Sequence, residues 1–390
     1  CIFLTNGSTA GILSAILTVC KPKDKLIVAR NCHASVWNAL VFADVIPIYV
    51  TPKYSNNMFL QVDEKEIQNI LIKYPDVCGA IVVSPTYEGI VSNIRKIKEV
   101  LKDKILIVDE AHGAHFNISA AFPKSSVHCG ADLVIHSMHK TLPTISQSAL
   151  IHICSTKIAY RNLVDSIQMV QTSSPSYIMM GLMDYIRAYL QNNKRKIHLN
   201  YVKPLCDLRR DLGKLTKLSL FSYYNYDISK IVIMTNNYLT GYGLAQILRE
   251  DYNIEVEASF ESYIIIMTSV ADNKRNLQKL LNSLLQIDSK LSTKKAYTVN
   301  SDKIPNFINS YMSVRDIKYK EHILIDINNS IGYICAKNIV IYPPGIPIVC
   351  IGEIITKKII TLICNNQNRI MGIVKNKKLY ILVVKGGYHG

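Results

Sequence analysis

The chain has 390 residues, of which 49% are hydrophobic and 19% are charged, and its formal net charge is +16. This composition excludes a largely disordered protein and predicts two or three domains with buried cores. No apolar run approaches the roughly 20 residues that span a bilayer. The basic residues are dispersed and lack interleaved aromatics. We therefore expect a solvated basic surface, with no nucleic acid and no membrane among the partners.

The ten cysteines are scattered, and the closest two, Cys20 and Cys32, are twelve positions apart. No pair has the C-x-x-C spacing typical of zinc or redox sites. We therefore expect reduced thiols in a cytoplasmic protein. The sequence starts at Cys1, directly before an apolar run at residues 2–4 that predicts a strand. We accordingly expect an N-terminal segment of the protein to precede this sequence.

Up to residue 153, short apolar runs alternate with segments of helical periodicity. Strands are expected at residues 2–4, 26–29, 43–49, 79–83, 105–108, 132–135 and 149–153, with helices such as 63–73 and 92–102 between them. This βαβ alternation predicts an α/β domain with a mostly parallel sheet and helices on both faces. Ligands of such sheets gather at the carboxyl ends of the strands.

Residues 6–9, Asn-Gly-Ser-Thr, connect the first strand to a helix. Glycine lets the backbone turn, and free N–H groups at a helix start attract anions. The stretch therefore suggests a phosphate cradle with Ser8 and Thr9. The alternative is a plain helix start in which Ser8 or Thr9 is the N-cap.

Other polar residues follow neighbouring strands. His33 comes after strand 26–29, where its imidazole either lies flat on an aromatic cofactor or caps the next helix. The residues alone do not separate these two interpretations. Turn-forming residues after strand 79–83 place Thr86 and Tyr87 at the same edge of the sheet.

The most informative stretch is His-Ser-Met-His-Lys at residues 136–140, which follows an apolar run, as Asp109-Glu110-Ala111-His112 follows run 105–108. A lysine, an aspartate and a histidine thus converge on one edge. A lysine among apolar neighbours can lose its proton and form an imine with a carbonyl group. We predict that Lys140 carries pyridoxal phosphate and that Asp109 faces the ring nitrogen of this cofactor.

A metal site is an alternative for the same region, using His112, His115, His136 and His139. The H-x-x-H spacing at strand ends is poor for zinc, and a metal would leave Lys140 unexplained. We therefore predict no metal.

The second half changes character near residue 193, after an expected connecting helix at 178–192. Helices are expected at 198–215, 238–252 and 273–291, a strand at 230–235, and a strand at 254–268 with a break near Ser259. This pattern predicts a small α+β domain. Glu255 and Glu257 are expected in the strand at 254–268. Either they have a role in the site, or they are ordinary strand charges that face the solvent. Residues 293–302 suggest a polar linker, 341–347 a rigid turn, and 369–384 a β-rich end.

Taken together, these motifs resemble the Orn/Lys/Arg decarboxylases, class-I pyridoxal-phosphate-dependent enzymes of fold type I, in their shorter bacterial form. The matching stretches are residues 6–9, 30–33, 84–89, 109–115, 137–140, 172–177 and 342–347. The set is specific for this family because of the order of three motifs: D-E-A-H comes first, S-x-H-K follows it, and Y-P-P-G-I-P comes late in the chain. The resemblance implies the large domain of fold-type-I transferases at 1–192, a small α+β domain at 193–302 and a C-terminal decarboxylase domain at 303–390.

The resemblance also implies roles for single residues. Lys140 would hold the cofactor as a Schiff base, with Asp109 at the ring nitrogen, His33 stacked on the ring and His112 beside the imine and the substrate. Ser8, Thr9 and Ser137 would bind phosphate, with His139 also in the cofactor site. Glu257 would face the distal cation of the substrate, and Thr86 is a further substrate-binding candidate. Residues 172–174 would reach the partner's active site, because this family builds its sites at a dimer interface.

The implied reaction is decarboxylation of arginine, lysine or ornithine to a polyamine-pathway amine in a homodimer or higher oligomer. The short form favours arginine by analogy alone. Either His112 or Lys140 would return the proton to Cα. One alternative is another fold-type-I enzyme such as an aminotransferase, which usually grips the substrate carboxylate with a small-domain arginine. The sequence offers no strong candidate for this arginine, and Arg249 is left open. The other is a truncated homologue without catalysis.

Overall fold

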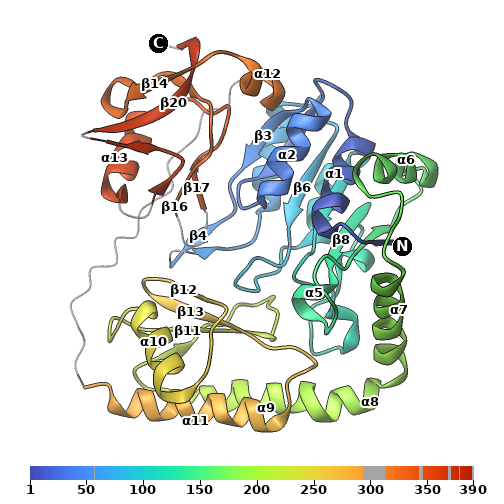
Figure 1. Cartoon of the computed structure of the whole chain (residues 1–390), viewed down its shortest axis with the longest axis vertical. Coiled ribbons are helices and arrows are strands. Elements are labelled where there is room, and N and C mark those ends of the chain that lie inside the picture. Colours follow the sequence, from blue (N-terminus) through green and yellow to red (C-terminus); the bar gives the residue numbers. More distant parts are fainter. Residues whose placement is uncertain (57, 293–311, 342–345, 368–369, 377, 389–390) are drawn as a thin grey trace.

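The computed structural model describes residues 1–56, 58–292, 312–341, 346–367, 370–376 and 378–388. In this part of the chain, a large sheet with flanking helices lies above a smaller sheet that rests on two long helices, and a β-rich C-terminal part packs beside the large sheet (Figure 1). The α/β architecture expected from the sequence is confirmed.

The large sheet has the strand order β1-β9-β8-β7-β6-β2-β3. Its strands are β1 (Ile2–Leu4), β2 (Lys25–Ala29), β3 (Ile46–Val50), β6 (Gly79–Val83), β7 (Ile105–Asp109), β8 (Leu133–Ser137) and β9 (Ala149–Ile153). All pairs from β3 across to β8 are parallel, whereas β9 is antiparallel to both neighbours. The short helix α5 (Met138–Thr141) between β8 and β9 is too small for a crossover, so the chain returns in the opposite direction.

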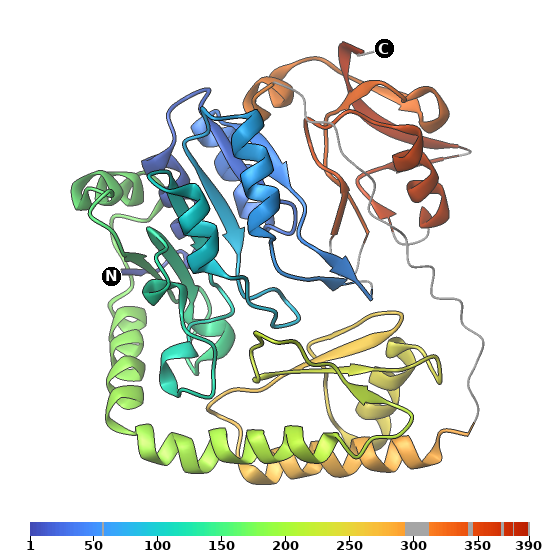
Figure 2. The same ribbon diagram turned by 180° about the vertical axis from the view of Figure 1, so that it is seen from behind.

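Helices cover both faces of this sheet, as expected. On the face seen in Figure 1 lie α1 (Gly7–Val19) and α2 (Ala34–Ala43), and on the face seen in Figure 2 lie α3 (Glu64–Lys73) and α4 (Ile94–Leu101). A helix missed by the sequence analysis, α6 (Tyr160–Val170), packs on α1. A small hairpin, β4 (Tyr54–Ser55) and β5 (Met58–Phe59), extends from the domain.

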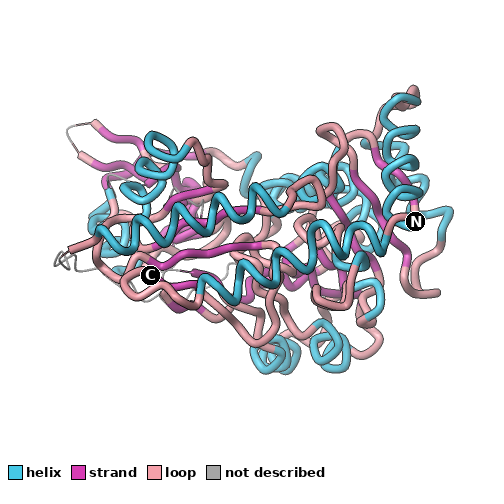
Figure 3. Tube along the Cα trace, turned by 90° about the horizontal axis from the view of Figure 1, so that it is seen from below, coloured by secondary structure: helices cyan, strands magenta, loops and turns pink. Residues whose placement is uncertain are grey.

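The connection to the second sheet is helical. Helix α7 (Tyr177–Asn192) leads into α8 (Lys194–Ile197), a π-helical turn (His198–Val202) and α9 (Lys203–Leu212). This segment lies beside α11 (Lys274–Lys290), and Figure 3 shows the two long helices from below.

The small sheet is antiparallel, and α10 (Gly241–Tyr252) packs on it. Its order is β10 (Ser219–Leu220), β11 (Lys230–Met234), β13 (Tyr263–Met267) and β12 (Ala258–Ser259). The break expected near Ser259 in the strand 254–268 is confirmed, because β12 ends at Ser259 and forms a hairpin with β13 that is closed by a bond from the Phe260 N–H to the Tyr263 carbonyl. The two rings stack at 4.4 Å, which favours this reversal. Glu255 and Glu257 therefore precede β12 and are outside the strands.

The C-terminal part is built from short strands and two helices. These are α12 (Val314–Tyr319), β14 (His322–Asp326), β15 (Tyr333–Cys335), β16 (Ile339–Ile341), β17 (Ile346–Val349), α13 (Lys357–Asn365), β18 (Ile370–Met371), β19 (Val374–Lys375) and β20 (Leu379–Tyr388). The β-rich end is thus confirmed from residue 370 on. The expected linker 293–302 and residues 342–345 of the expected turn lie outside the described residues. The three domain boundaries stay a prediction.

A buried ion pair fastens the C-terminal part to the large sheet. Arg30 directly follows β2, and its guanidinium pairs with the carboxylate of Glu353 while both side chains are fully buried. The guanidinium also donates to the carbonyls of Pro347 and Ile348, at 3.4 and 3.3 Å. The second carboxylate oxygen of Glu353 accepts from the Cys350 N–H at 2.7 Å. Each buried charge therefore has partners, as it must in a low-dielectric interior.

Replacing Glu353 with Gln leaves the Arg30 charge buried without its counter-ion. We expect a loss of about 3–5 kcal/mol in the stability of the C-terminal docking. Hydrogen exchange of the β14 and β20 amides measures this loss locally. The matched control is Glu321→Gln, since Glu321 pairs with Lys385 at 2.7 Å on the exposed surface, and its effect should stay below about 1 kcal/mol. Equal effects of the two changes would contradict the structural role of the buried pair.

Candidate active site

Strand register brings the expected polar residues to one edge of the large sheet. Asp109 is level with Val83 of β6 and with Ile135 of β8. Ser137, at the end of β8, is level with Ala149, which in turn is level with Leu4 at the end of β1. The carboxyl ends of β1, β6, β7 and β8 therefore meet at this edge, as the sequence predicted.

Lys140 and His112 meet at the centre of this edge. Lys140 lies in α5 and is exposed, and its Nζ is 3.3 Å from Nε2 of His112 on the loop after β7. The imidazole is packed edge-on against the ring of Tyr87, with 5.5 Å between centroids. Burial lowers the pKa of His112 well below its ordinary value, and the nearby charges of Lys230 and Lys140 lower it further. His112 is therefore neutral near pH 7.

Asp109 is buried and accepts a hydrogen bond from the Ala111 N–H at 3.1 Å. Burial raises the pKa of this carboxyl, and Lys140 and His33 oppose the rise. His33 is the N-cap of α2, because its Nδ1 accepts from the Ser35 N–H at 3.2 Å. The capping interpretation is thus confirmed, while the exposed ring stays available to a ligand. Partial burial lowers the pKa of His33.

The start of α1 lies beside this cluster. Asn6 is the N-cap but makes no side-chain bond to the helix, so the alternative that Ser8 or Thr9 caps it is wrong. Gly7 has a φ of +73°, a conformation that strains other residues. Its N–H donates to the Gln147 carbonyl at 2.8 Å. Ser8 is half-buried and Thr9 is exposed, so both can reach a ligand.

Three buried hydroxyl groups around this edge make no hydrogen bond within the described residues. They belong to Thr5, Ser137 and Thr141. A buried polar atom without a partner costs about 1–3 kcal/mol, so such atoms usually mark a ligand or water. Thr5 follows β1 and Ser137 ends β8, two strands that both pair with β9, and Thr141 is in the same short helix as Lys140. Hydroxyl groups are suitable hydrogen-bond donors to the phosphate of a cofactor.

The remaining predicted residues are held by their own contacts. His139 donates from Nδ1 to the Ser148 carbonyl at 3.0 Å. The buried Thr86 hydroxyl accepts from the Ile90 N–H at 3.3 Å and so stabilises its own loop. Glu257 is exposed, and its carboxylate accepts from the Tyr87 hydroxyl at 2.8 Å. This last bond brings a small-domain carboxylate to the ring that contacts His112.

The sequence analysis missed Lys230, the first residue of β11. Its side chain is fully buried, and its Nζ is 3.2 Å from Nδ1 of His112. Burial lowers the pKa of Lys230 to about 8, although Asp227, Glu257 and Glu88 oppose this shift. A lysine that opens an apolar strand is expected at the surface, so no sequence signal pointed to it.

The four histidines considered as metal ligands lie in separate hydrogen-bond networks. Nε2 of His115 lies 3.0 Å from the Asp227 carboxylate, and Nε2 of His136 lies 2.6 Å from Glu110. Glu110 also accepts from the Ser125 and Ser126 hydroxyls, at 2.6 and 2.8 Å. Within the described residues, no group of three or more His, Cys, Asp or Glu side chains is placed to hold a metal ion.

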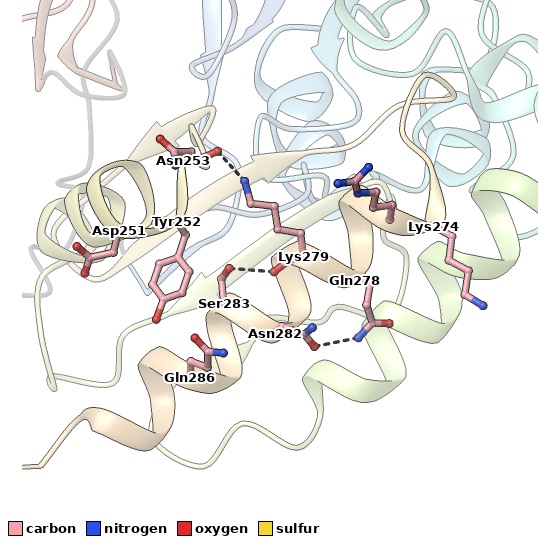
Figure 4. Close-up of a pocket in the computed structure, with 10 residues that line it drawn as sticks. Asp251, Tyr252, Asn253, Lys274, Gln278, Lys279, Asn282, Ser283 and Gln286 are labelled. Carbon is pink, nitrogen blue, oxygen red and sulfur yellow. Dashed lines mark hydrogen bonds between the residues drawn. The ribbon is translucent and has the colours of Figure 1, made fainter.

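An open depression on the small domain does not belong to this site. Figure 4 shows it between the end of α10 and α11, with Lys279 bonded to the Asn253 carbonyl at 3.2 Å and Gln278 bonded to Asn282 at 3.0 Å. The residues that line it have polar or charged side chains, and none of them is a predicted site residue. Among the described residues, no helix is both long enough and apolar enough to cross a membrane.

Comparisons with known proteins agree with the fold and motifs. The family model described as "Orn/Lys/Arg decarboxylase, major domain" matches residues 1–232. The arginine decarboxylase of Halalkalibacterium halodurans is 32% identical over 381 residues, which cover 94% of this chain and 77% of that protein. The arginine decarboxylase of Bacillus subtilis is 29% identical over 378 residues, covering 93% and 77%. The crystal structure of a lysine decarboxylase from Francisella novicida superposes with a TM-score of 0.81 at 20% identity, covering 98% of this chain and 69% of that one.

The depressed pKa of His112 makes stability depend on pH. Below about pH 6.5 the unfolded chain binds a proton that the folded chain refuses, so acid favours unfolding. We expect the free energy of unfolding to fall by up to about 1.4 kcal/mol per pH unit from this group. His112→Gln should flatten this acid slope in urea titrations, whereas His198→Gln, on an exposed residue, should leave it unchanged. An unaltered slope in His112→Gln would refute the assignment.

Proposed function

Because this chain belongs to the Orn/Lys/Arg decarboxylase family, we propose that it removes carbon dioxide from a basic amino acid with pyridoxal phosphate bound to Lys140. The observation that carries the proposal is the arrangement at the sheet edge. Nζ of Lys140 lies 3.3 Å from Nε2 of His112. The positive charge of Lys140 also lowers the pKa of the buried Asp109 carboxyl, against the rise that burial causes. A lysine, an acid and a histidine in this arrangement are what a lysine-bound cofactor requires.

The residues at the edge fit the cofactor. Pyridoxal phosphate supplies an electron sink for the electron pair that carbon dioxide leaves behind on Cα. We assign Asp109 to the ring nitrogen, because an ionised carboxylate beside it keeps that nitrogen protonated. His33 would lie on the ring and His139 beside it. Ser8, Thr9 and Ser137 would bind the phosphate, which is supported by the unpartnered Ser137 hydroxyl and by the α1 start without a side-chain cap.

The chain's own groups would orient the substrate and manage its proton. The reaction requires the scissile bond to stand perpendicular to the cofactor ring, and water must be kept out. His112 and Lys140 are the two groups placed to return a proton to Cα. Tyr87 on the loop after β6 and Lys230 of β11 pack against His112 and would help to keep water from it.

We assign the distal cation of the substrate to Glu257. Its carboxylate is exposed, carries the required charge, and is held at the edge of the site by the Tyr87 hydroxyl. Thr86 supports the same loop. Among basic amino acids, arginine is favoured because the relatives from Halalkalibacterium halodurans and Bacillus subtilis, which match more than 90% of the chain, are named arginine decarboxylase. The product would then be a polyamine-pathway amine.

The aminotransferase alternative has less support. Those enzymes usually hold the substrate carboxylate with an arginine of the small domain. The candidate, Arg249, instead makes two bonds to the Glu255 carboxylate, at 2.7 and 2.5 Å, on the exposed surface. A homologue without catalysis is also less favoured, because Lys140, His112 and Asp109 are all present and close together.

We further propose that two copies of the chain associate. Helices α6 and α7 carry large apolar side chains with no cover from the described part of the chain, namely Tyr160, Met169, Tyr177, Ile178 and Tyr185. Tyr177 and Ile178 are each 83% exposed. Exposed apolar clusters of this kind mark interaction sites. Residues 172–174 lie shortly before Ser176, the N-cap of α7, so this interface would carry them toward the partner's active site.

Activity measurements test the reaction and the role of Lys140 in binding the cofactor. We expect the chain supplied with pyridoxal phosphate to release carbon dioxide from arginine, lysine or ornithine, with arginine fastest. Lys140→Ala should abolish both turnover and the absorbance of the lysine-bound cofactor. Asp109→Asn should lower turnover at least about tenfold, the effect of one pKa unit at the ring nitrogen. Asp103→Asn, on an exposed residue, is the control. Transamination without carbon dioxide release would refute the proposal.

Sedimentation tests the association. Ile178→Asp places a charge on the proposed interface and should weaken the dimer about 10- to 100-fold, the value of one buried isoleucine side chain. Ile72→Asp is the matched control, because Ile72 is 76% exposed on α3, outside the proposed interface. If both variants sediment like the unmodified chain, α7 is not the interface.

A further inference from the structure

The small domain is paired with the large domain through the main chain. Residues 89–91, on the loop after β6, run antiparallel to residues 225–227, which precede β11. Ile90 lies opposite Tyr226 in a β-bridge, and main-chain hydrogen bonds of 3.0 and 2.8 Å flank this bridge. A displacement of one segment relative to the other would break both bonds together. The pairing therefore resists movement of the small domain.

Side chains of the same segment, residues 223–230, hold two more loops of the large domain. The Tyr223 hydroxyl donates to the side-chain carbonyl of Gln61, shortly after β5, at 2.5 Å. Nε2 of His115, on the loop after β7, lies 3.0 Å from the Asp227 carboxylate, and both residues are buried. Separating this pair inside the protein would leave two buried polar groups without each other, which is costly. One segment thus holds the loops after β5, β6 and β7.

The two domains also share hydrophobic contacts. Val91, Phe116 and Phe122 belong to loops of the large domain, yet they are buried in the cluster that α9, β11, α10, β13 and α11 form. Met58 of β5 is fully buried in a second cluster, with side chains of β11 and β13. Rotation of the small domain would expose these four side chains to water, which opposes the rotation.

The helical connection between the domains contains an irregular turn, the π-helical residues His198–Val202. Such turns are places where a long helix can bend. Here Tyr201 is buried, and its ring stacks on Phe122 of the large domain with 6.3 Å between centroids. Its hydroxyl lies 2.9 Å from the hydroxyl of Thr268, which follows β13. The turn is therefore packed against both domains and is not free to act as a hinge.

We propose that segment 223–230 locks the small domain to the large domain, so that the active site keeps one geometry while the substrate binds, reacts and leaves. The meaning of this lock for catalysis rests on the proposed function. Under that function, the contact of Lys230 with His112 exists before the substrate arrives. The contact of Glu257 with Tyr87 exists before it as well. The site is thus preorganised, and no binding energy is needed to close the small domain.

A disulfide across the bridge tests the lock. Ile90 and Tyr226 face each other in a pair whose hydrogen bonds belong to their neighbours, a geometry with about 4.5 Å between the Cα atoms. Disulfides span Cα separations of about 4.4–6.8 Å. The double variant Ile90→Cys/Tyr226→Cys can therefore be linked with the thiol oxidant diamide and released with a thiol reductant, and mass spectrometry verifies the linkage.

We expect the linked double variant to release carbon dioxide from arginine as fast as its own reduced form, within about threefold. The reduced form is the reference because it contains the same two substitutions. The unmodified chain, treated with diamide in the same way, controls for its ten cysteines. A larger loss of turnover that reduction reverses, and that the unmodified chain does not show, contradicts the lock.

Thiol labelling tests the lock at a second place and without turnover. Met58→Cys puts a thiol between the domains, at a fully buried position. We expect this thiol to be labelled as slowly as the buried Cys32 and at least about 100-fold more slowly than the exposed Cys206, with or without pyridoxal phosphate and arginine. A smaller difference, or a rate that rises more than about tenfold when both compounds are added, overturns the proposal, because it shows that the domains separate.

Failure of the lock and failure of the proposed function give different results. If the unmodified chain and the reduced double variant release no carbon dioxide, the proposed function fails, and labelling of Met58→Cys without added compounds still decides the lock. If only the double variant fails to fold, the same labelling decides. Turnover that stops only in the linked form, or fast labelling of Met58→Cys in an active chain, refutes the lock and leaves the proposed function standing.

Discussion

A neutral imidazole between two lysines organises the centre of this protein. His112 contacts Lys140 at 3.3 Å on one side and Lys230 at 3.2 Å on the other. A positive charge on the imidazole would be buried away from water and repelled by both lysines, so the ring stays neutral. The contact joins the loop after β7 of the large sheet, the short helix α5 that carries Lys140, and strand β11 of the small domain. The position of the small domain and the chemistry at the sheet edge are therefore linked.

The chain carries a net charge of +16. Within the described residues, the two fully buried cations, Arg30 and Lys230, nevertheless lie beside carboxylates. Arg30 is neutralised by Glu353 of the C-terminal part, and Lys230 lies among Asp227, Glu257 and Glu88. Arg30 is only three positions before His33, so the C-terminal part supports the segment that carries a predicted cofactor contact. A buried charge must keep its partner close, so these contacts hold together parts of the chain that are distant in sequence.

Local patterns in the sequence were sufficient to predict the parallel sheet. They were also sufficient to predict that Asp109, His112 and Lys140 lie at one edge of it. Buried parallel strands are short continuous apolar runs, and their carboxyl ends meet at one edge, so the residues after each run are brought together. The direction of β9 and the hairpin of β12 and β13 were not predictable in this way. A strand pairs in either direction with the same residues, and the choice is made by the connection and by contacts such as Phe260 on Tyr263.

The sequence by itself determined the family resemblance, the sheet edge and the lysine at its centre, because periodicity and motif spacing are local properties of the chain. Only the tertiary structure placed Lys230 against His112, 118 positions away, and Glu353 against Arg30, 323 positions away. No periodicity relates residues so far apart. Their contacts arise when apolar surfaces pack and the remaining buried charges must find partners within the same interior.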